Sequence, residues 1–435
     1  MKKILLLLLI CFSIISKSYS FIIRDSEIES VVKKLVSPIA KAANQNSEKL
    51  KIIIINDNNA NAFVTPGQKI FIFSGLISNS KSPNELEGVL AHELGHITGK
   101  HHVRIYEQLG KARIISIVGI ILGGAATLAT GDSDALAAIG GGAQTLSQRS
   151  FLNFSRAQEG SADQSGFRFL KDSNKSICGI ISFLEFLQSQ ETLGMQDEYM
   201  RSHPVTGKRI FDAQMAAKGE NCNEPKNSIQ EIKEYKFIQA KLYGFINPEN
   251  TIKIINDSEY FDQDQKDYAL AIANYKLLNL KEGNFLINKL IKKYPNNPYF
   301  YELKAQMLRD NGYIKESINN YLKAIKIKPD DSLMLIELSQ AQINEESPNN
   351  LLNAIKNLKK ASIVENQNEK LWYLLSVAYG RNNEMSKSRY ASAYSAYLKG
   401  DDVRALNFIK KAKKIVKKNS VEWNKLDNLE SIIKK

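Results

Sequence analysis

Histidine and cysteine are scarce in this chain of 435 residues, which contains five histidines and three cysteines. In other respects the composition is ordinary, because 43% of the residues are hydrophobic and 24% are charged. These proportions are typical of folded proteins and exclude both a disordered chain and a membrane protein with several spans. The length allows two or three domains, each able to bury its own core.

The chain also lacks a recognisable nucleic-acid motif, although its formal net charge is +13. The one dense basic run is KKAKKIVKK at 410–418, and it has no interleaved aromatic residues. We therefore expect no nucleic-acid partner. At helical spacing the run predicts a solvated helix face, and a contact with anionic lipid or an acidic partner is the alternative.

Residues 1–20 predict a cleaved signal peptide. They begin with the basic MKK and continue with ILLLLLICFSII, which is too short to span a bilayer comfortably. Small residues at Ser18 and Ser20 suit a cleavage site. We expect export across an inner membrane into the periplasm, and an uncleaved N-terminal anchor is the alternative.

Cleavage would leave two cysteines, Cys178 and Cys222, in an oxidising compartment. A disulfide between them would contribute about 4 kcal/mol to stability by the chain-entropy model. The alternative is one buried thiol and one unpaired thiol. Their spacing does not fit a pair of metal ligands.

Two β-rich runs follow a helix that we expect at about residues 25–45. They are LKIIIINDN (50–58) and KIFIFSGLI (69–77), separated by turn residues at 65–68. The sequence therefore predicts a small sheet near the N-terminus of the mature chain.

A further helix is expected to begin at Ser82, because this serine is a suitable N-cap and Pro83 follows it in the first turn. Gly88 and Gly95 share one face of the helix and would let a neighbouring element approach closely. An apolar stripe predicts that another face packs on a core; it consists of Leu86, Leu90, Leu94 and Ile97.

Residues 114–146 contain the most apolar stretch of the mature chain. The run at 114–130 reaches only the lower length limit for crossing a bilayer, and a polar break separates it from a second apolar stretch. The pattern favours a helical hairpin, which either packs against the folded domain or dips into a membrane surface as a peripheral contact.

From about residue 228 the pattern changes to helices with an internal repeat. Pro295 and Pro329 lie 34 residues apart, and the residues between them fit a tetratricopeptide repeat. Weaker copies lie at 264–296, 331–367 and 368–420. The sequence thus predicts a mainly α fold with a small β-sheet, divided into a signal peptide (1–20), a first domain (21–227) and an all-α tetratricopeptide-repeat solenoid (228–435).

The segment HELGH at 92–96 carries the strongest chemical signal. Residues i and i+4 of a helix face the same way, so the imidazoles of His92 and His96 can bind one zinc ion. Glu93 is turned away from both and can act as a base on a metal-bound water. The alternative is two buried histidines whose ring nitrogens have hydrogen-bond partners and bind no metal.

A catalytic zinc needs a third protein ligand. Glu159 and Asp163 lie on one face of a predicted helix, so Glu159 can complete the metal shell while Asp163 accepts a hydrogen bond from a ligand histidine. A solvated pair of acids is the alternative interpretation. We expect His101 and His102, just beyond the helix, to be exposed.

The order of these motifs resembles the periplasmic, tetratricopeptide-bearing branch of the zinc peptidase family that includes the prenyl-protein and heat-shock membrane proteases. The resemblance is carried by NAFVTPGQKIFIFSGLI, HELGH, the helix with Glu159 and Asp163, SHPVTGKR and the repeats. It implies a zincin-like α+β metallopeptidase domain with one Zn²⁺ per chain. It also implies His203 as a fourth ligand that keeps the enzyme latent, and Arg209 in the active site.

The resulting hypothesis is a zinc endopeptidase of the cell envelope that hydrolyses misfolded or stalled outer-membrane proteins. The repeats would deliver clients or dock on the outer-membrane barrel assembly machinery, and substrate would lie along a sheet edge formed by KIFIF (69–73). The competing hypothesis is a periplasmic chaperone or scaffold that acts through the repeats and whose zinc site is latent or structural.

Overall fold

The structure is a computed structural model that describes residues 22–47, 50–65, 69–101, 146–192 and 203–434. The expected signal peptide and the hairpin expected at 114–146 lie outside these residues, apart from Leu146. Within the described part of the chain, no helix combines the length and the apolar character needed to cross a membrane.

The chain divides into two compact units. Unit 1 comprises Met1–Arg24 and Ile28–Leu242, and unit 2 comprises Asp25–Glu27 and Tyr243–Lys435. The division falls inside helix α13 (Ile229–Ile246). Within unit 1, Gln239 of this helix donates hydrogen bonds of 2.8 Å to the carbonyls of both Ile77 and Ser80.

Unit 1 contains a four-stranded sheet in the order β1-β2-β4-β3. The strands are β1 (Ile22–Ile23), β2 (Lys51–Ile55), β3 (Ala62–Thr65) and β4 (Lys69–Phe73). β2 and β4 run parallel, whereas β1 and β3 are antiparallel to their neighbours. The small sheet is thus confirmed, together with the mainly α character of the fold.

The strand KIFIF is β4, and the expectation that it forms a sheet edge is wrong. β4 pairs with β2 on one side and with β3 on the other, so its backbone is bonded on both sides. In the described part of the chain, β3 pairs only with β4 and forms one edge of the sheet, while β1 forms the other. The remainder of the predicted strand is also different, since the chain enters helix α3 (Ser74–Asn79) directly after Phe73.

Helix α2 (Ser26–Ala42) confirms the helix expected near residues 25–45. The motif helix is α4 (Pro83–Thr98), and it begins as predicted with Ser82 as N-cap and proline in the first turn. The Ser82 side chain itself makes no capping hydrogen bond. Instead, the Glu85 carboxylate accepts a hydrogen bond of 2.8 Å from the backbone N–H of Lys81.

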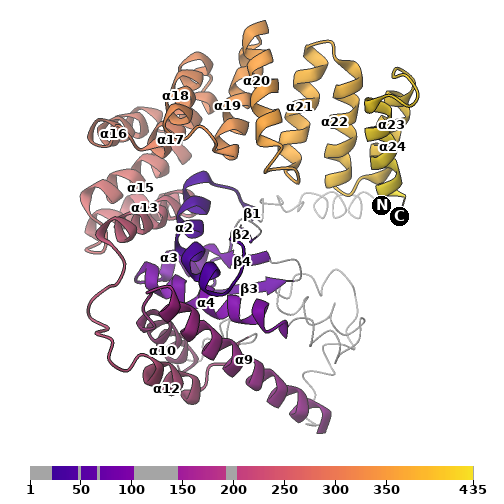
Figure 1. The fold of residues 1–435 in the computed structure, drawn as a ribbon. Coiled ribbons are helices and arrows are strands. Elements are labelled where there is room, and N and C mark those ends of the chain that lie inside the picture. Colours follow the sequence, from indigo (N-terminus) through magenta and orange to yellow (C-terminus); the bar gives the residue numbers. More distant parts are fainter. Residues whose placement is uncertain (1–21, 48–49, 66–68, 102–145, 193–202, 435) are drawn as a thin grey trace, which may run out of the picture. The chain divides into compact units, whose positions relative to one another are not determined.

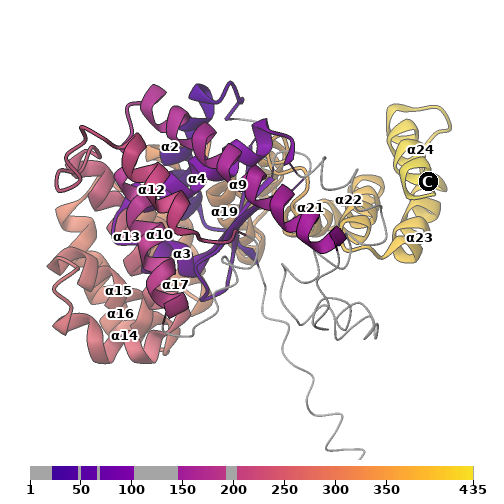
Figure 2. The same ribbon diagram turned by 90° about the horizontal axis from the view of Figure 1, so that it is seen from below.

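Helix α4 is buried along almost its whole length because it lies between the sheet and two further helices, as Figure 1 shows. These are α9 (Leu146–Asp172) and α10 (Cys178–Thr192). The predicted apolar stripe is confirmed, since all four of its residues are buried. In Figure 2, α9 runs alongside α4, and α12 (Gly207–Ala216) lies beside α9 and α10.

The two glycines of α4 admit two different helices rather than one element. A Cβ added to Gly95 would lie 2.5 Å from the carbonyl oxygen of Ala162 in α9, and one added to Gly88 would lie 2.8 Å from the backbone nitrogen of Ile180 in α10. Only glycine permits such close approaches of helix backbones. The backbone of α4 is therefore held directly against both neighbours.

A disulfide joins Cys178, the first residue of α10, to Cys222 in the segment after α12, with their Cα atoms 5.4 Å apart. The closed loop spans 44 residues and contains α12. The disulfide thus ties α12 to the start of α10.

Unit 2 is all-α, with helix pairs that follow one another along the chain. After α14 (Pro248–Ile254) and a 3-10 turn at Ile255–Asp257, successive pairs begin at residues 263, 298, 332, 369 and 402, close to the spacing of about 34 residues typical of tetratricopeptide repeats. The pairs are α15 (Gln263–Lys276) with α16 (Leu280–Lys293), α17 (Pro298–Asp310) with α18 (Ile314–Ile327), α19 (Ser332–Glu345) with α20 (Pro348–Ala361), α21 (Glu369–Arg381) with α22 (Met385–Leu398), and α23 (Asp402–Lys413) with α24 (Val421–Ile433). An all-α repeat region therefore follows the first unit.

Candidate metal centre

The two motif histidines lie one turn apart on α4 and point their Nε2 atoms into the same buried space. The Nε2 atoms of His92 and His96 are 3.0 Å apart, and the two rings are nearly perpendicular. Both side chains are buried, although imidazoles are usually at least partly exposed. The helix thus presents two nitrogen donors from a rigid backbone.

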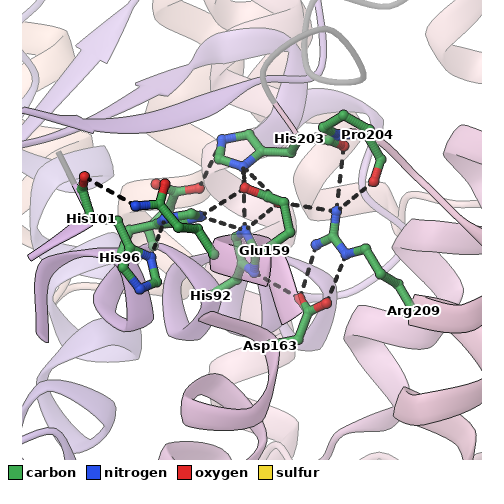
Figure 3. A network of polar contacts seen from close by, with 10 residues as sticks. His92, His96, His101, Glu159, Asp163, His203, Pro204 and Arg209 are labelled. Atoms are coloured by element: carbon green, nitrogen blue, oxygen red, sulfur yellow. Dashed lines mark hydrogen bonds and ion pairs between the residues drawn. The ribbon is translucent and has the colours of Figure 1, made fainter. Parts of the chain in front are cut away.

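Two further donors reach the same space from outside α4. Glu159 of α9 places one carboxylate oxygen 3.4 Å from His92 Nε2 and the other 3.3 Å from His96 Nε2. His203, in the segment before α12, places Nδ1 3.1 Å from Glu159 and 3.3 Å from His92 Nε2. Figure 3 shows the four side chains converging.

These distances fit a tetrahedral metal site. Ligands at about 2.0–2.1 Å from a common ion would lie about 3.3 Å from one another in a tetrahedron. All four ligand atoms lie within 4.8 Å of each other, and the closest separations are near the tetrahedral value. Three imidazoles and one carboxylate are also a donor set that suits a borderline transition metal.

Asp163 lies one helical turn after Glu159 and supports His92 from behind. Its Oδ1 is 2.8 Å from His92 Nδ1, so the ring can donate a proton there while Nε2 faces the cluster. Arg209 of α12 donates to both oxygens of the same carboxylate, at 2.7 and 2.9 Å. Burial alone would raise the pKa of Asp163, but the bonds from His92 and Arg209 outweigh it and lower that pKa to about 2.

Arg209 reaches the cluster and donates to several neighbouring oxygens. Besides its pair with Asp163, its Nη1 lies 3.1 Å from a Glu159 oxygen and donates to the carbonyls of Pro204, at 3.1 Å, and His203, at 3.4 Å. Arg209 therefore links the acids of α9 to the backbone that carries His203.

Glu93 is fully buried, and neither of its carboxylate oxygens has a hydrogen-bond partner among the described residues. The Nε2 atom of His203 lies 3.5 Å from Glu93 Oε1. Burial raises the pKa of Glu93 more than the nearby positive groups lower it. Burying a carboxylate without a hydrogen-bond partner is costly, and such groups are found mainly at functional sites.

The two motif histidines respond oppositely to their surroundings. Burial lowers the pKa of both, but Asp163 and Glu159 raise that of His92 to about 9. The pKa of His96 falls to about 3, because burial and the positive His92 outweigh its single contact with Glu159. The two imidazoles therefore differ in their affinity for a proton, although both direct Nε2 into the same cluster.

His101 is not exposed, and that expectation is wrong. Its side chain is buried, and its Nδ1 lies 2.9 Å from Nδ1 of His96. The chain turns back immediately after α4, because Lys100 has a left-handed backbone with φ of 51°. The sequence signal was a histidine five residues after His96, with a glycine two residues before it that leaves room for its ring. His102 lies outside the described residues.

A buried helix with a His-Glu-x-x-His motif, completed by an acid from a second helix, defines a metallopeptidase centre. Residues 23–217 match the model of peptidase family M48, so this part of the chain is a peptidase M48 domain. The protein is a metalloendopeptidase whose histidine and glutamate cluster is suited to a metal ion.

The chain is similar over most of its length to curated relatives. It is 23% identical over 414 residues to the beta-barrel assembly-enhancing protease of Yersinia pestis, covering 93% of this chain and 83% of the relative. The protein of that name in Escherichia coli (strain K12) is 22% identical over 413 residues, with the same coverage. The mitochondrial metalloendopeptidase OMA1 of Schizosaccharomyces pombe is 26% identical over 212 residues, covering 47% of this chain and 59% of the relative.

Proposed function

We propose that the protein is a zinc endopeptidase of the bacterial cell envelope that cleaves misfolded or stalled outer-membrane proteins. The observation that carries this proposal is the buried cluster of four ligand atoms within 4.8 Å, with the unbonded carboxylate of Glu93 beside it. His92, His96 and Glu159 are the proposed ligands, and Asp163 orients His92.

Zinc suits the donor set, because three imidazole nitrogens and one carboxylate oxygen are ligands that it prefers in tetrahedral geometry. When bound, it supplies a Lewis acid that polarises the scissile carbonyl and makes water a nucleophile near neutral pH. Side chains of the protein are proposed to transfer the proton and to stabilise negative charge on the substrate.

Glu93 is the proposed general base. Its raised pKa and lack of hydrogen-bond partners suit a carboxylate that takes a proton from the attacking water and passes it to the leaving amine. Arg209 is the proposed residue that stabilises negative charge on the substrate. Because Arg209 is bonded to Asp163, we expect it to act on the substrate through its charge from beside the cluster.

His203 is the proposed fourth ligand of a latent state. It lies between Glu159 and Glu93, and so occupies the space that water and a substrate carbonyl need. Arg209 holds the backbone of His203 and Pro204 in this position. Activation then requires His203 to leave the cluster.

Substrate is proposed to bind as an extended strand along β3. This strand packs against α4, and in the described part of the chain it has a neighbour on one side only. The carbonyl of Asn61 accepts a hydrogen bond from Phe73, so the alternation of antiparallel pairing directs the backbone groups of partly exposed Val64 away from β4. Main-chain pairing of this kind reads an extended shape rather than a sequence, which suits unfolded clients.

The cellular role is proposed from the similarity to proteases named for β-barrel assembly. Residues 1–20 would direct export to the periplasm as a cleaved signal peptide. Residues 228–435 would form a tetratricopeptide-repeat domain that receives clients or docks on the barrel assembly machinery. In this proposal the peptidase domain comprises residues 21–227 and the repeat domain comprises residues 228–435.

A second candidate is a periplasmic chaperone or scaffold with a structural zinc site. The observation that favours it is the position of His203, because four protein ligands close a zinc site to water. In that case the repeats alone would perform the cellular role.

The substitution Glu93→Gln separates these two candidates. We expect it to retain zinc and to reduce cleavage of a denatured outer-membrane barrel by a factor of at least about 100, the lower end of the contribution of general acid–base catalysis. A matched control is Glu87→Gln, a buried carboxylate on the same helix that contacts Lys175 and Asn227 instead of the cluster. Cleavage by Glu93→Gln at the wild-type rate would refute the base, and an intact cellular role in that variant would favour the scaffold.

A further inference from the structure

We infer that His101 is a positioning residue, which accepts a hydrogen bond from His96 and thereby holds the Nε2 atom of His96 toward the metal. The inference rests on the zinc site of the proposed function. His101 and His96 meet through their Nδ1 atoms at 2.9 Å, with ring centroids 5.0 Å apart and ring planes nearly perpendicular. Figure 3 shows His101 beside His96, away from Glu159.

The contact allows only one arrangement of protons when the metal is bound. A neutral imidazole that binds a metal through Nε2 carries its proton on Nδ1 and can only donate there. His101 must therefore offer the lone pair of its own Nδ1 and carry its proton on Nε2. In the reverse arrangement, the proton of His96 would sit on Nε2 and block coordination.

The local backbone positions the ring of His101. Helix α4 ends at Thr98, and the left-handed backbone of Lys100 turns the chain back over the last helical turn. A Cβ added to Gly99 would lie 2.3 Å from His101 Nε2, so only glycine leaves room for the ring. Gln158, which directly precedes Glu159 in the sequence, donates a hydrogen bond of 3.5 Å from its side chain to the backbone carbonyl of His101.

An imidazole is also the suitable acceptor at this position. His92 already has the carboxylate of Asp163 as its partner, and Glu159 and Glu93 bring two more buried acids to the cluster. A second supporting carboxylate would add another buried negative charge next to these, which is costly. A neutral histidine supplies the acceptor without the charge.

Two substitutions of His101 test the inference on the full-length protein. His101→Leu fills a similar volume without an acceptor, whereas His101→Asn keeps an oxygen near the position of Nδ1. The measurements are the zinc dissociation constant, from competition with a chelator, and the visible absorption spectrum of the Co²⁺-substituted protein. Loss of an outer-shell partner weakens metal binding by about 10- to 100-fold.

We expect this loss and an altered Co²⁺ spectrum in His101→Leu, with zinc affinity and spectrum close to wild type in His101→Asn. Equal weakening in both variants, or none in either, would overturn the inference. Thermal unfolding of the metal-free proteins checks that each variant folds. Should His101→Leu fail to fold, Gly99→Ala displaces the same ring and is expected to weaken zinc binding similarly, and unchanged affinity there would contradict the inference. A wild-type protein that binds no zinc would instead refute the proposed function.

Discussion

At the scale of single residues, the centre combines groups that would be costly in isolation. Glu93 is buried without a hydrogen-bond partner among the described residues, and His92 is hydrogen-bonded to the buried acid Asp163. Arg209 compensates for part of this charge through its paired bonds to Asp163. Buried polar groups in proteins usually have hydrogen-bond partners, and the exceptions are concentrated at binding and catalytic sites.

The variant His203→Ala tests latency. Because His203 occupies the space between Glu159 and Glu93, its removal should open the site and raise the rate at which an unfolded protein is cleaved several-fold. The rate is followed by the loss of full-length substrate on gels. The double variant with Glu93→Gln should be inactive, which shows that the added activity comes from this site. An unchanged or lower rate in the single variant would refute the latch.

The residues within one helix were predictable from the sequence, and those that depend on distant contacts were predictable only in part. His92, Glu93 and His96 follow from helical spacing alone, because neighbours four residues apart share a face. Spacing left the role of Glu159 open, and the roles of His203 and Arg209 came from the family resemblance. His101 was missed because its burial depends on the backbone of Lys100, which no apolar pattern reveals.

At the scale of elements, the centre depends on how closely α4 and α9 approach. The two helices meet where Gly95 faces the backbone of Ala162, three residues after Glu159. The distance between the helix axes therefore determines whether the Glu159 carboxylate reaches His92 and His96. The position of KIFIF (69–73) in the sheet belongs to the same scale. Its prediction as an edge was wrong because pairing between strands is not encoded in the alternation of any single strand.

The substitution Gly95→Ala tests this packing. Its Cβ would lie 2.5 Å from a backbone oxygen, so α4 and α9 must move apart, at a cost of about 1–3 kcal/mol in the free energy of unfolding. We expect lower stability in a denaturant titration and weaker zinc binding. The matched control is Gly160→Ala, since a Cβ there meets nothing within 4 Å and should leave stability unchanged or raise it by up to about 1 kcal/mol. Equal stability of both variants would contradict the packing argument.

At the scale of the whole molecule, the chain joins a metallopeptidase unit to an all-α repeat region. The fold class was predictable, because the change from mixed elements to regularly spaced helices is visible in the sequence from about residue 228. The border after residue 227 stays a prediction, and Gln239 in the helix that follows it donates to the chain at Ile77 and Ser80. Buried hydrophobic residues lie in both units.

The metal content of the purified full-length protein tests the central claim most directly. Atomic emission spectroscopy, with protein concentration from amino-acid analysis, should give one zinc ion per chain for the wild type. The variant His96→Ala removes a nitrogen that lies 3.0 Å from His92 Nε2, and it should contain almost none while its circular dichroism shows the same helix content. A folded wild-type protein that takes up no zinc from zinc-containing buffer, or a His96→Ala variant that retains a full equivalent, would contradict the assignment of this centre.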